Sequence, residues 1–190
     1  MPVQIWKSDL QQEIDNKGII RTVNHRGTVL NSIAKFPTAT YIKNTGSIIL
    51  LAPIPFMASI VSVIGRSSGG EFGVADMGIY GIRSNGSVDQ NTAINRNAYR
   101  GDKRIANNQI TDILHPGDWG LTLHELCCDN NGMPIEAYEP YVGQRFGMLA
   151  LTGINNNTVT VNTSLQFRIQ YVEGNASEMI QIGKSNNRVR

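Results

Sequence analysis

The sequence predicts an all-β protein, an antiparallel β-sandwich of jelly-roll-like or immunoglobulin-like type, with long loops and extended N- and C-terminal arms. Short apolar runs rich in Val and Ile alternate with turns of Gly, Asn and Pro, and no long amphipathic helical pattern interrupts them. Only 17% of the residues are charged, and Asn, Thr, Ser and Gly are abundant instead. This composition favours turns and strand edges over helices.

The chain divides into three parts. Residues 1–35 form an expected N-terminal arm, because their apolar residues are scattered without a sustained period. Residues 36–173 carry the strand signals and form the expected sandwich domain. Residues 174–190 are polar apart from one apolar patch and form the expected C-terminal arm. Since neither arm is apolar enough to build its own core, both are expected to contact other chains.

Residues 47–64 are the most apolar segment and carry no charge. Their number is close to the ~20 residues that a membrane-spanning helix needs. However, Pro53 and Pro55 would break helical hydrogen bonds, and the many β-branched residues favour strands. We therefore expect two strands, residues 47–51 and 58–65, with a break at the prolines, and no membrane span.

Further along the chain, turn signals separate the expected elements. Residues 73–82 read as a strand that ends before the turn signal Asn85-Gly86. The polar residues 85–110 are expected to form a long loop, and residues 127–144 a second one. Short helical turns are expected between these loops.

The C-terminal third has the clearest period. Residues 146–151 read as a strand, and a second strand is expected over residues 160–172. In that strand, Leu165, Phe167, Ile169 and Tyr171 alternate with Gln166, Arg168 and Gln170. A period of two predicts one buried face and one face in water.

The net charge of the chain is small, but the charged residues are unevenly distributed along it. The formal net charge of +2 is too small to predict nucleic-acid binding. Residues 83–104 are basic and include Arg96, Arg100 and Arg104, whereas residues 112–139 carry six acidic side chains and no Lys or Arg. The two segments are either solvated loops or complementary patches that pair between neighbouring subunits.

The sequence contains two candidate metal sites. Zinc could use His115, His124 and the thiols of Cys127 and Cys128, but no C-x-x-C pair is present, and two buried thiols are the simpler interpretation. Adjacent cysteines rarely bond to each other, so no disulfide framework is expected, in agreement with assembly in a reducing cytoplasm.

Calcium is the second candidate metal. Oxygen donors at Asp129, Glu136 and Glu139 could bind Ca²⁺, although their spacing does not match an EF-hand loop and Asp129 also opens an ordinary turn sequence. Both interpretations of Asp129 stay open.

Enzymatic motifs are missing from the sequence. It contains no G-x-S-x-G nucleophile elbow, no P-loop and no G-x-G-x-x-G fingerprint. The three histidines have no Ser or Asp partner at a motif spacing. We therefore expect neither an enzyme nor a cofactor.

Several aromatic residues lie in polar segments, where they could pack on the core of the domain or contact a partner. Trp119, Tyr138 and Tyr141 are either lids over the core of the domain or anchors, and next to acidic residues they could also stack on sugars. Trp6 lies on the expected arm and is the favoured anchor for a partner.

The order of elements resembles a known group. An apolar strand runs into Ala52-Pro53-Ile54-Pro55, a Val- and Ile-rich strand follows at residues 60–64, and later come Ala75-Asp76-Met77-Gly78-Ile79-Tyr80 and Phe167-Arg168-Ile169-Gln170-Tyr171-Val172. This pattern resembles small β-sandwich proteins encoded among the head and tail genes of tailed bacteriophages, such as capsid decoration and other minor virion proteins. The resemblance spans about two-thirds of the chain.

The resemblance implies a non-enzymatic virion protein, made in the cytoplasm of a bacterial host. Its expected partners are other virion proteins (the major capsid protein, or neck and tail proteins) and further copies of itself, with no nucleic acid and no membrane. Capsid decoration is the first expectation; a neck or tail component, or a carbohydrate- or receptor-binding module, is the alternative. The candidate contact residues are Ile5, Trp6, Leu10, Arg96, Arg100, Arg104, Met179 and Ile180.

Overall fold

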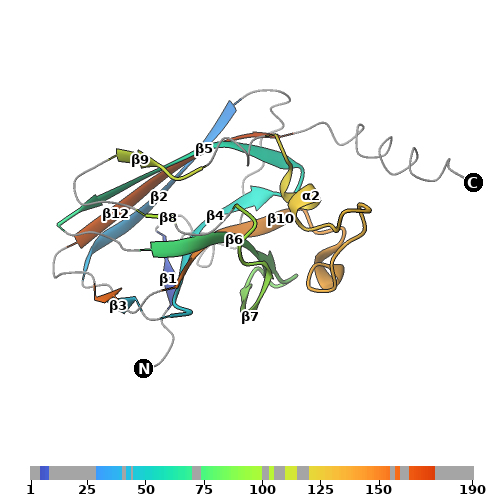
Figure 1. Cartoon of the computed structure of the whole chain (residues 1–190), viewed down its shortest axis with the longest axis horizontal. Helices are drawn as coiled ribbons and strands as arrows, with labels where there is room; N and C mark the ends of the chain where they lie inside the picture. Colours follow the sequence, from blue (N-terminus) through green and yellow to red (C-terminus); the bar gives the residue numbers. More distant parts are fainter. Residues whose placement is uncertain are drawn as a thin grey trace, which may run out of the picture.

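The computed structural model describes residues 5–8, 29–39, 42–43, 45–69, 74–99, 103–104, 110–114, 120–154, 157–158 and 163–173. Over these residues the chain is almost entirely β-structure, and two sheets share one hydrophobic core (Figure 1). The predicted all-β sandwich is confirmed.

Sheet A has six strands. Its order is β1 (Ile5–Lys7), β4 (Ile48–Pro55), β10 (Phe146–Gly153), β6 (Val74–Ile82) and β7 (Val88–Asn95), and the short β8 (Lys103–Arg104) also pairs with β6. The pairs are antiparallel except that β1 runs parallel to β4.

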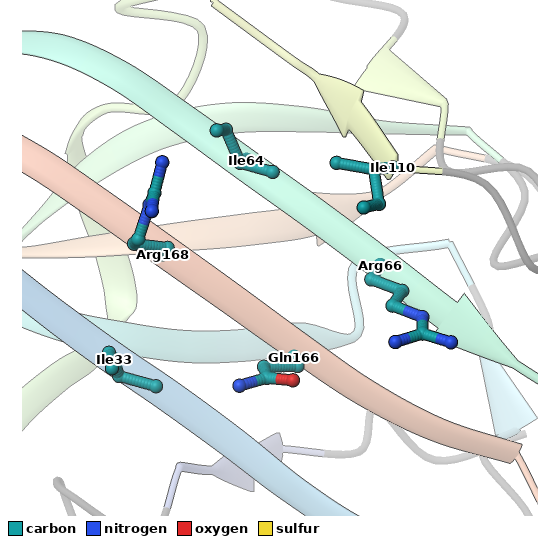
Figure 2. A pocket seen from close by; sticks show the side chains of 6 residues that line it. All are labelled: Ile33, Ile64, Arg66, Ile110, Gln166 and Arg168. Carbon is teal, nitrogen blue, oxygen red and sulfur yellow. The ribbon is translucent and has the colours of Figure 1, made fainter.

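Sheet B has four antiparallel strands. Its order is β2 (Val29–Ala39), β12 (Thr163–Glu173), β5 (Ala58–Ser68) and β9 (Ile110–Asp112). One face covers the core, and Figure 2 shows side chains of all four strands on the other face. The short strands β3 (Ile42–Lys43) and β11 (Asn157–Thr158) form a separate pair.

Strand β12 confirms the alternation read from the sequence. Leu165, Phe167 and Ile169 are at most 1% exposed, whereas Gln166 and Arg168 are exposed. Tyr171 is only half-buried, because the pairing of β12 with β5 shifts register between Gln170 and Tyr171. A register shift of this kind re-aims the side chains that follow it.

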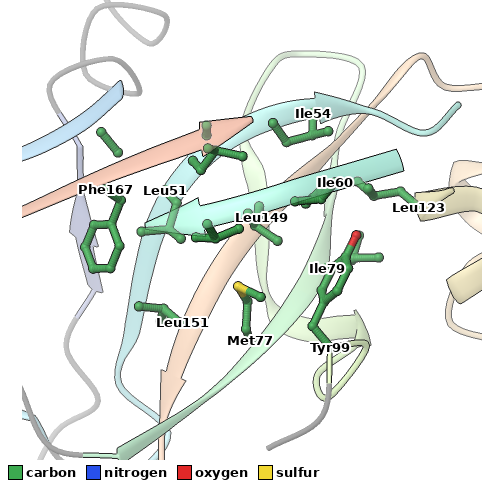
Figure 3. Close-up of a cluster of buried hydrophobic side chains, with 14 of the residues drawn as sticks. Leu51, Ile54, Ile60, Met77, Ile79, Tyr99, Leu123, Leu149, Leu151 and Phe167 are labelled. Carbon is green, nitrogen blue, oxygen red and sulfur yellow. The ribbon is translucent and has the colours of Figure 1, made fainter. Parts of the chain in front are cut away.

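The main core lies between the two sheets. Figure 3 shows side chains of both sheets meeting there, including Leu51, Ile79 and Leu149 from sheet A and Ile60 and Phe167 from sheet B. A second, smaller cluster lies on the other face of sheet A and contains Ile48, Leu50, Tyr80, Ile82, Val88, Met148 and Ala150. Sheet A is therefore buried on both faces, which explains why β4 is a continuous apolar run.

The expected break at Pro53 and Pro55 is wrong. Strand β4 continues through both prolines to Pro55, and the chain turns at Phe56 and Met57 before β5 begins in the other sheet. The N–H of Phe56 donates to the carbonyl of Arg145 at 3.0 Å, so the nitrogens of Pro55 and Pro53 face away from β10. On that side β1 pairs only with Ile48–Leu50, so neither proline has to supply an N–H to a described strand.

The expected long loop over residues 85–110 is also corrected. The turn at Asn85-Gly86 is confirmed: Gly86 has a φ of 82°, and its N–H donates to the carbonyl of Arg83 at 2.8 Å. The chain then returns along β6 as strand β7, which sequence reasoning missed because its residues are mostly polar. A polar strand forms here since only Val88 and Ile94 are buried, and the other residues of β7 are exposed or half-buried.

Residues 120–144 close one end of the sandwich. They contain the short helix α2 (Leu123–Leu126) and the 3-10 helix η2 (Glu139–Tyr141). The N–H of His124 donates to the carbonyl of Phe56 at 2.7 Å, and the rings of Phe56 and Tyr138 lie 4.9 Å apart. This segment is thus anchored to the connection between the two sheets.

The sheets also extend into the expected N-terminal arm. Strand β1 pairs with β4, and β2 begins at Val29 and pairs with β12, so these residues belong to the sandwich. The expected C-terminal arm, residues 174–190, lies outside the described residues. Among the residues that are described, no helix is long and apolar enough to cross a membrane.

Candidate assembly interface

The outer face of sheet B carries an open groove. We define the sheet B face as Ile33, Lys35, Ile64, Arg66, Ile110, Gln166 and Arg168. Register brings these residues together: Arg168 lies between Ile33 and Ile64, and Gln166 lies between Lys35 and Arg66. Ile110 of β9 pairs with Arg66. The groove between them has a volume of about 280 Å³ (Figure 2).

The basic side chains of this face have no acidic partner. Lys35, Arg66 and Arg168 are exposed, and no carboxylate within the described ranges forms an ion pair with them. Other arginines of the protein are paired, for example Arg96 with Asp76 at 3.1 Å. The sheet B face is therefore a basic surface without ion pairs among the described residues, and apolar side chains line its groove.

A second surface has the opposite charge. We define the acidic segment as residues 120–144, which contain Glu125, Asp129, Glu136 and Glu139 and no Lys or Arg. All four carboxylates are exposed. Glu125 takes part in the capping box of α2 with Thr122, whereas no cation of the described residues pairs with Glu136 or Glu139.

Asp129 shapes the tip of the acidic segment. Its Oδ1 accepts hydrogen bonds of 2.9 Å from the N–H groups of Asn131 and Met133, and these bonds hold the pKa of this carboxyl below its usual value. Its own N–H donates to the carbonyl of Met133 at 2.8 Å. The turn presents Met133 to solvent with 63% of its surface exposed.

Exposed apolar side chains gather on the same parts of the molecule. Among the described residues, the large hydrophobic side chains that are exposed all belong either to sheet B or to the acidic segment. They are Val29, Ile33, Val61 and Ile110 in sheet B, and Leu121, Met133 and Val142 in the acidic segment. Clustering of this kind is typical of interaction surfaces.

Three titratable side chains of the acidic segment lie close together. Nδ1 of His124 lies 3.0 Å from the hydroxyl of Tyr138, and Nε2 lies 3.8 Å from Sγ of Cys128. Burial lowers the pKa of His124, with Glu125 opposing the shift, and burial raises the pKa of the Cys128 thiol. Burial, helped by Cys128, also raises the pKa of the neighbouring Cys127 to about 12. These thiols are therefore held as neutral S–H groups, the opposite of what a nucleophile needs.

The described residues contain no group of three His, Cys, Asp or Glu side chains placed to hold a metal ion. The Oδ1 atom of Asp129 is used in the turn, and the Cys127 side chain is buried in the core. His115 lies outside the described residues.

For Tyr138 and Tyr141 the structure supports the lid over the core and not the anchor. Tyr138 and Tyr141 are only 2% and 7% exposed, so they pack in the core and present no ring on which a sugar could stack. The segment folds back onto Phe56 and Gly81, and this decides between the two interpretations. Trp119 lies outside the described residues.

The predicted contact residues divide into three groups. Ile5 is half-buried and packs against the second core cluster, and Arg96 is tied to Asp76 and to the carbonyl of Gly153. Trp6 lies in β1 and Arg104 in β8, and of these two residues only the backbone is described. The remaining four lie outside the described residues: Leu10, Arg100, Met179 and Ile180.

Sequence reasoning did not find the sheet B face. One signal was available, since Arg168 and Gln166 occupy the wet positions of the alternating strand. The other members come from β2, β5 and β9, and only the sheet pairing places them beside Arg168.

Comparison with known proteins shows which solved structures this architecture resembles. No protein-family model and no curated protein matches the chain. A chain from the capsid of Ralstonia phage GP4 is similar, with a TM-score of 0.58 and 15% sequence identity over 90% of this chain and 99% of that chain. The chain shares the fold of a phage capsid chain. A chain from the capsid asymmetric unit of cyanophage Pam1 aligns with a TM-score of 0.41 and 13% identity, over 82% of this chain and 94% of that chain.

The likeness to the Ralstonia phage chain extends over nearly the whole length of both chains. The two chains are therefore similar in length.

Proposed function

We propose that this protein is a non-enzymatic structural component of a bacteriophage virion, and specifically a capsid decoration protein that docks on the shell through its arms and loops. The observation that carries the proposal is the fold shared with a chain of the Ralstonia phage GP4 capsid over 90% of this chain and 99% of that chain. Such coverage indicates a shared overall architecture and not a local likeness of one motif.

The surface chemistry supports a binding role. A decoration protein acts through buried area and symmetry, with no turnover, so it needs open surfaces with apolar and charged groups. The sheet B face and the acidic segment have both. The thiols of Cys127 and Cys128 support the same proposal, because burial raises the pKa of both and keeps them neutral.

Expected partners are the major capsid protein and further copies of the chain, within a virion assembled in the bacterial cytoplasm. Trp6 of β1 and residues of the expected arms, including Leu10, Met179 and Ile180, are proposed to contact the shell. Segments that order on a partner lose entropy but can wrap a large surface.

A reconstruction of purified phage particles tests the proposal. We expect density for the sandwich at fixed symmetric positions on the outside of the shell, and particles that lack the protein should lose their shell integrity at a lower temperature. Density at the neck or tail would instead assign the protein to that part of the virion. A virion role would be refuted if purified particles contained none of this chain.

A further inference from the structure

We propose that the sheet B face of one molecule binds the acidic segment of a second copy of this chain, in a head-to-tail contact. The inference goes beyond the proposed function, because it concerns the purified protein alone and does not depend on where the protein sits in a virion.

Charge complementarity identifies the partner. Lys35, Arg66 and Arg168 have no carboxylate partner in the described part of the chain, and Glu136 and Glu139 have no cationic one. Unpaired charges of opposite sign on two surfaces of one protein favour their mutual contact and set its orientation. The same charges oppose contact of either surface with a second copy of itself, which excludes a two-fold symmetric dimer through one of them.

The apolar groups of the two surfaces are also complementary. Ile33 and Ile110 are 48% and 72% exposed beside the groove of about 280 Å³. Met133 is the most exposed large hydrophobic side chain of the acidic segment, at 63%. Because a methionine side chain is flexible and adapts to irregular apolar gaps, Met133 suits an open groove between isoleucines.

The acidic segment is already ordered for binding. The bonds from Asn131 and Met133 to Asp129 fix the turn, and Gly132, with a φ of 75°, donates its N–H to the carbonyl of Asp129 at 2.9 Å. A surface that is ordered before binding loses less entropy when it binds. Met133 is therefore presented without a folding step.

One molecule cannot satisfy both surfaces by itself. Figure 1 shows β9 and the C-terminal end of β5 at one end of the long axis, and α2 with the rest of the acidic segment at the other end. A contact between opposite ends of identical molecules is heterologous, and it closes into a ring or continues as a filament. The C-terminal residues 174–190 are a poor alternative occupant for the basic face, since they carry Lys184, Arg188 and Arg190 against a single acidic residue, Glu178.

Paired charge reversals test the proposal. The first variant carries Arg66→Glu and Arg168→Glu, and the second carries Glu136→Lys and Glu139→Lys. In the first variant alone the sheet B face becomes net negative like the acidic segment, and in the second variant alone the acidic segment loses its net negative charge. A mixture again offers each contact a favourable partner: the basic face of the second variant meets the unchanged acidic segment of the first, and the new lysines of the second meet the new glutamates of the first. Sedimentation velocity on the full-length protein measures the association.

We expect the unchanged protein to associate, and each variant alone to associate about 10-fold more weakly or worse. The equimolar mixture should associate nearly as well as the unchanged protein, and about 0.5 M salt should weaken this association.

A matched control changes the net charge elsewhere. Substitution of Glu at four exposed positions of the β6–β7 hairpin and β7 gives the same change in formal charge as the first variant; the positions are Ser84, Gln90, Asn91 and Thr92. This control should associate like the unchanged protein. Should the first variant fail to fold, Ile110→Glu on the basic face paired with Met133→Lys on the acidic segment repeats the same design.

Three outcomes would overturn the proposal. The unchanged protein could be monomeric at every concentration, or the mixture could fail to restore association. The charge reversals could also lower the melting temperature without affecting association, which would mean that another segment of the same chain covers the sheet B face. None of these results bears on the virion role, which the particle reconstruction tests separately.

Discussion

The hydroxyl of Tyr141 donates a hydrogen bond of 2.9 Å to Oδ2 of Asp89, 52 residues earlier in the chain. Arg83 pairs with the same carboxylate oxygen at 3.2 Å. The ring of Tyr141 lies against Gly81, where a side-chain Cβ would overlap the ring atoms. Tyr141 thus ties the acidic segment to the β6–β7 hairpin through both its ring and its hydroxyl.

The first prediction concerns Gly81. Gly81→Ala should lower the free energy of unfolding by about 1–3 kcal/mol, because the added methyl group collides with the buried ring of Tyr141. Urea denaturation measures the change. Gly147→Ala is the matched control: its Cβ would lie 3.0 Å from Phe56 and Ile79, so small shifts can accommodate it at a lower cost. A Gly81→Ala protein as stable as the original would contradict the packing described here.

The second prediction concerns the pH dependence of the Tyr141–Asp89 bond. Burial alone would raise the pKa of Asp89, but hydrogen bonds from Tyr141 and Arg83 hold that pKa below its ordinary value of 3.8. A carboxyl whose pKa is lower in the folded state stabilises the fold above its ordinary pKa, and this contribution is lost as the pH falls through the folded-state pKa. Tyr141→Phe should therefore cost about 1 kcal/mol at neutral pH, and less once the pH has fallen through the folded-state pKa of Asp89.

Urea titrations of Tyr141→Phe, Asp89→Asn and the double variant at several pH values measure this coupling. We expect the two single effects to be non-additive at neutral pH, because the residues share one hydrogen bond. Additive effects at every pH would show that the bond contributes nothing to stability.

The third prediction concerns the core under β12. Phe167 is fully buried, and its ring meets that of Phe36 edge-on with centroids 6.0 Å apart. Phe167→Ala should cost about 3–5 kcal/mol of unfolding free energy through lost burial and a cavity. Arg168→Ala, one residue along and exposed, should change stability by no more than about 0.5 kcal/mol. Similar costs at both positions would be inconsistent with a strand that has one wet face.

The fourth prediction concerns the thiols. Cys127 is buried with a pKa of about 12, whereas Cys128 is half-buried with a smaller rise in pKa. Because the thiolate is the form that reacts, iodoacetamide at about pH 8 should modify Cys128 slowly and Cys127 only after unfolding. Mass spectrometry of the native and urea-unfolded protein distinguishes the two sites. Rapid modification of Cys127 in the native state would show that the segment around it opens frequently.

The fifth prediction separates two neighbouring residues of β1. Trp6→Ala should weaken binding to phage particles by at least about 2 kcal/mol with little change in melting temperature, as expected of an aromatic anchor at an interface. Ile5→Ala should do the opposite, because Ile5 packs against the second core cluster of its own chain. Particle pull-down and thermal unfolding of both variants measure the two effects. A large loss of stability with unchanged binding for Trp6→Ala would assign Trp6 to the core.

Local sequence patterns were sufficient for several elements. Three predictions are confirmed: the alternation of Leu165, Phe167 and Ile169, the strand over residues 73–82, which is β6, and the turn at Asn85-Gly86. Each of these signals is contained in a few consecutive residues, where side-chain period and backbone preference act directly. The all-β fold follows from the repetition of such signals along the chain.

Tertiary structure decided the rest. Strand β4 tolerates Pro53 and Pro55 because their nitrogens face an edge that β1 does not reach, and Tyr138 is buried because the acidic segment folds onto Phe56. The sheet B face depends on pairing most of all, since β12 brings Arg168 beside Ile64, 104 positions earlier in the sequence (168 − 64). Sequence patterns report which side of a strand is wet, but only the hydrogen-bonded neighbours of that strand determine which residues share that side.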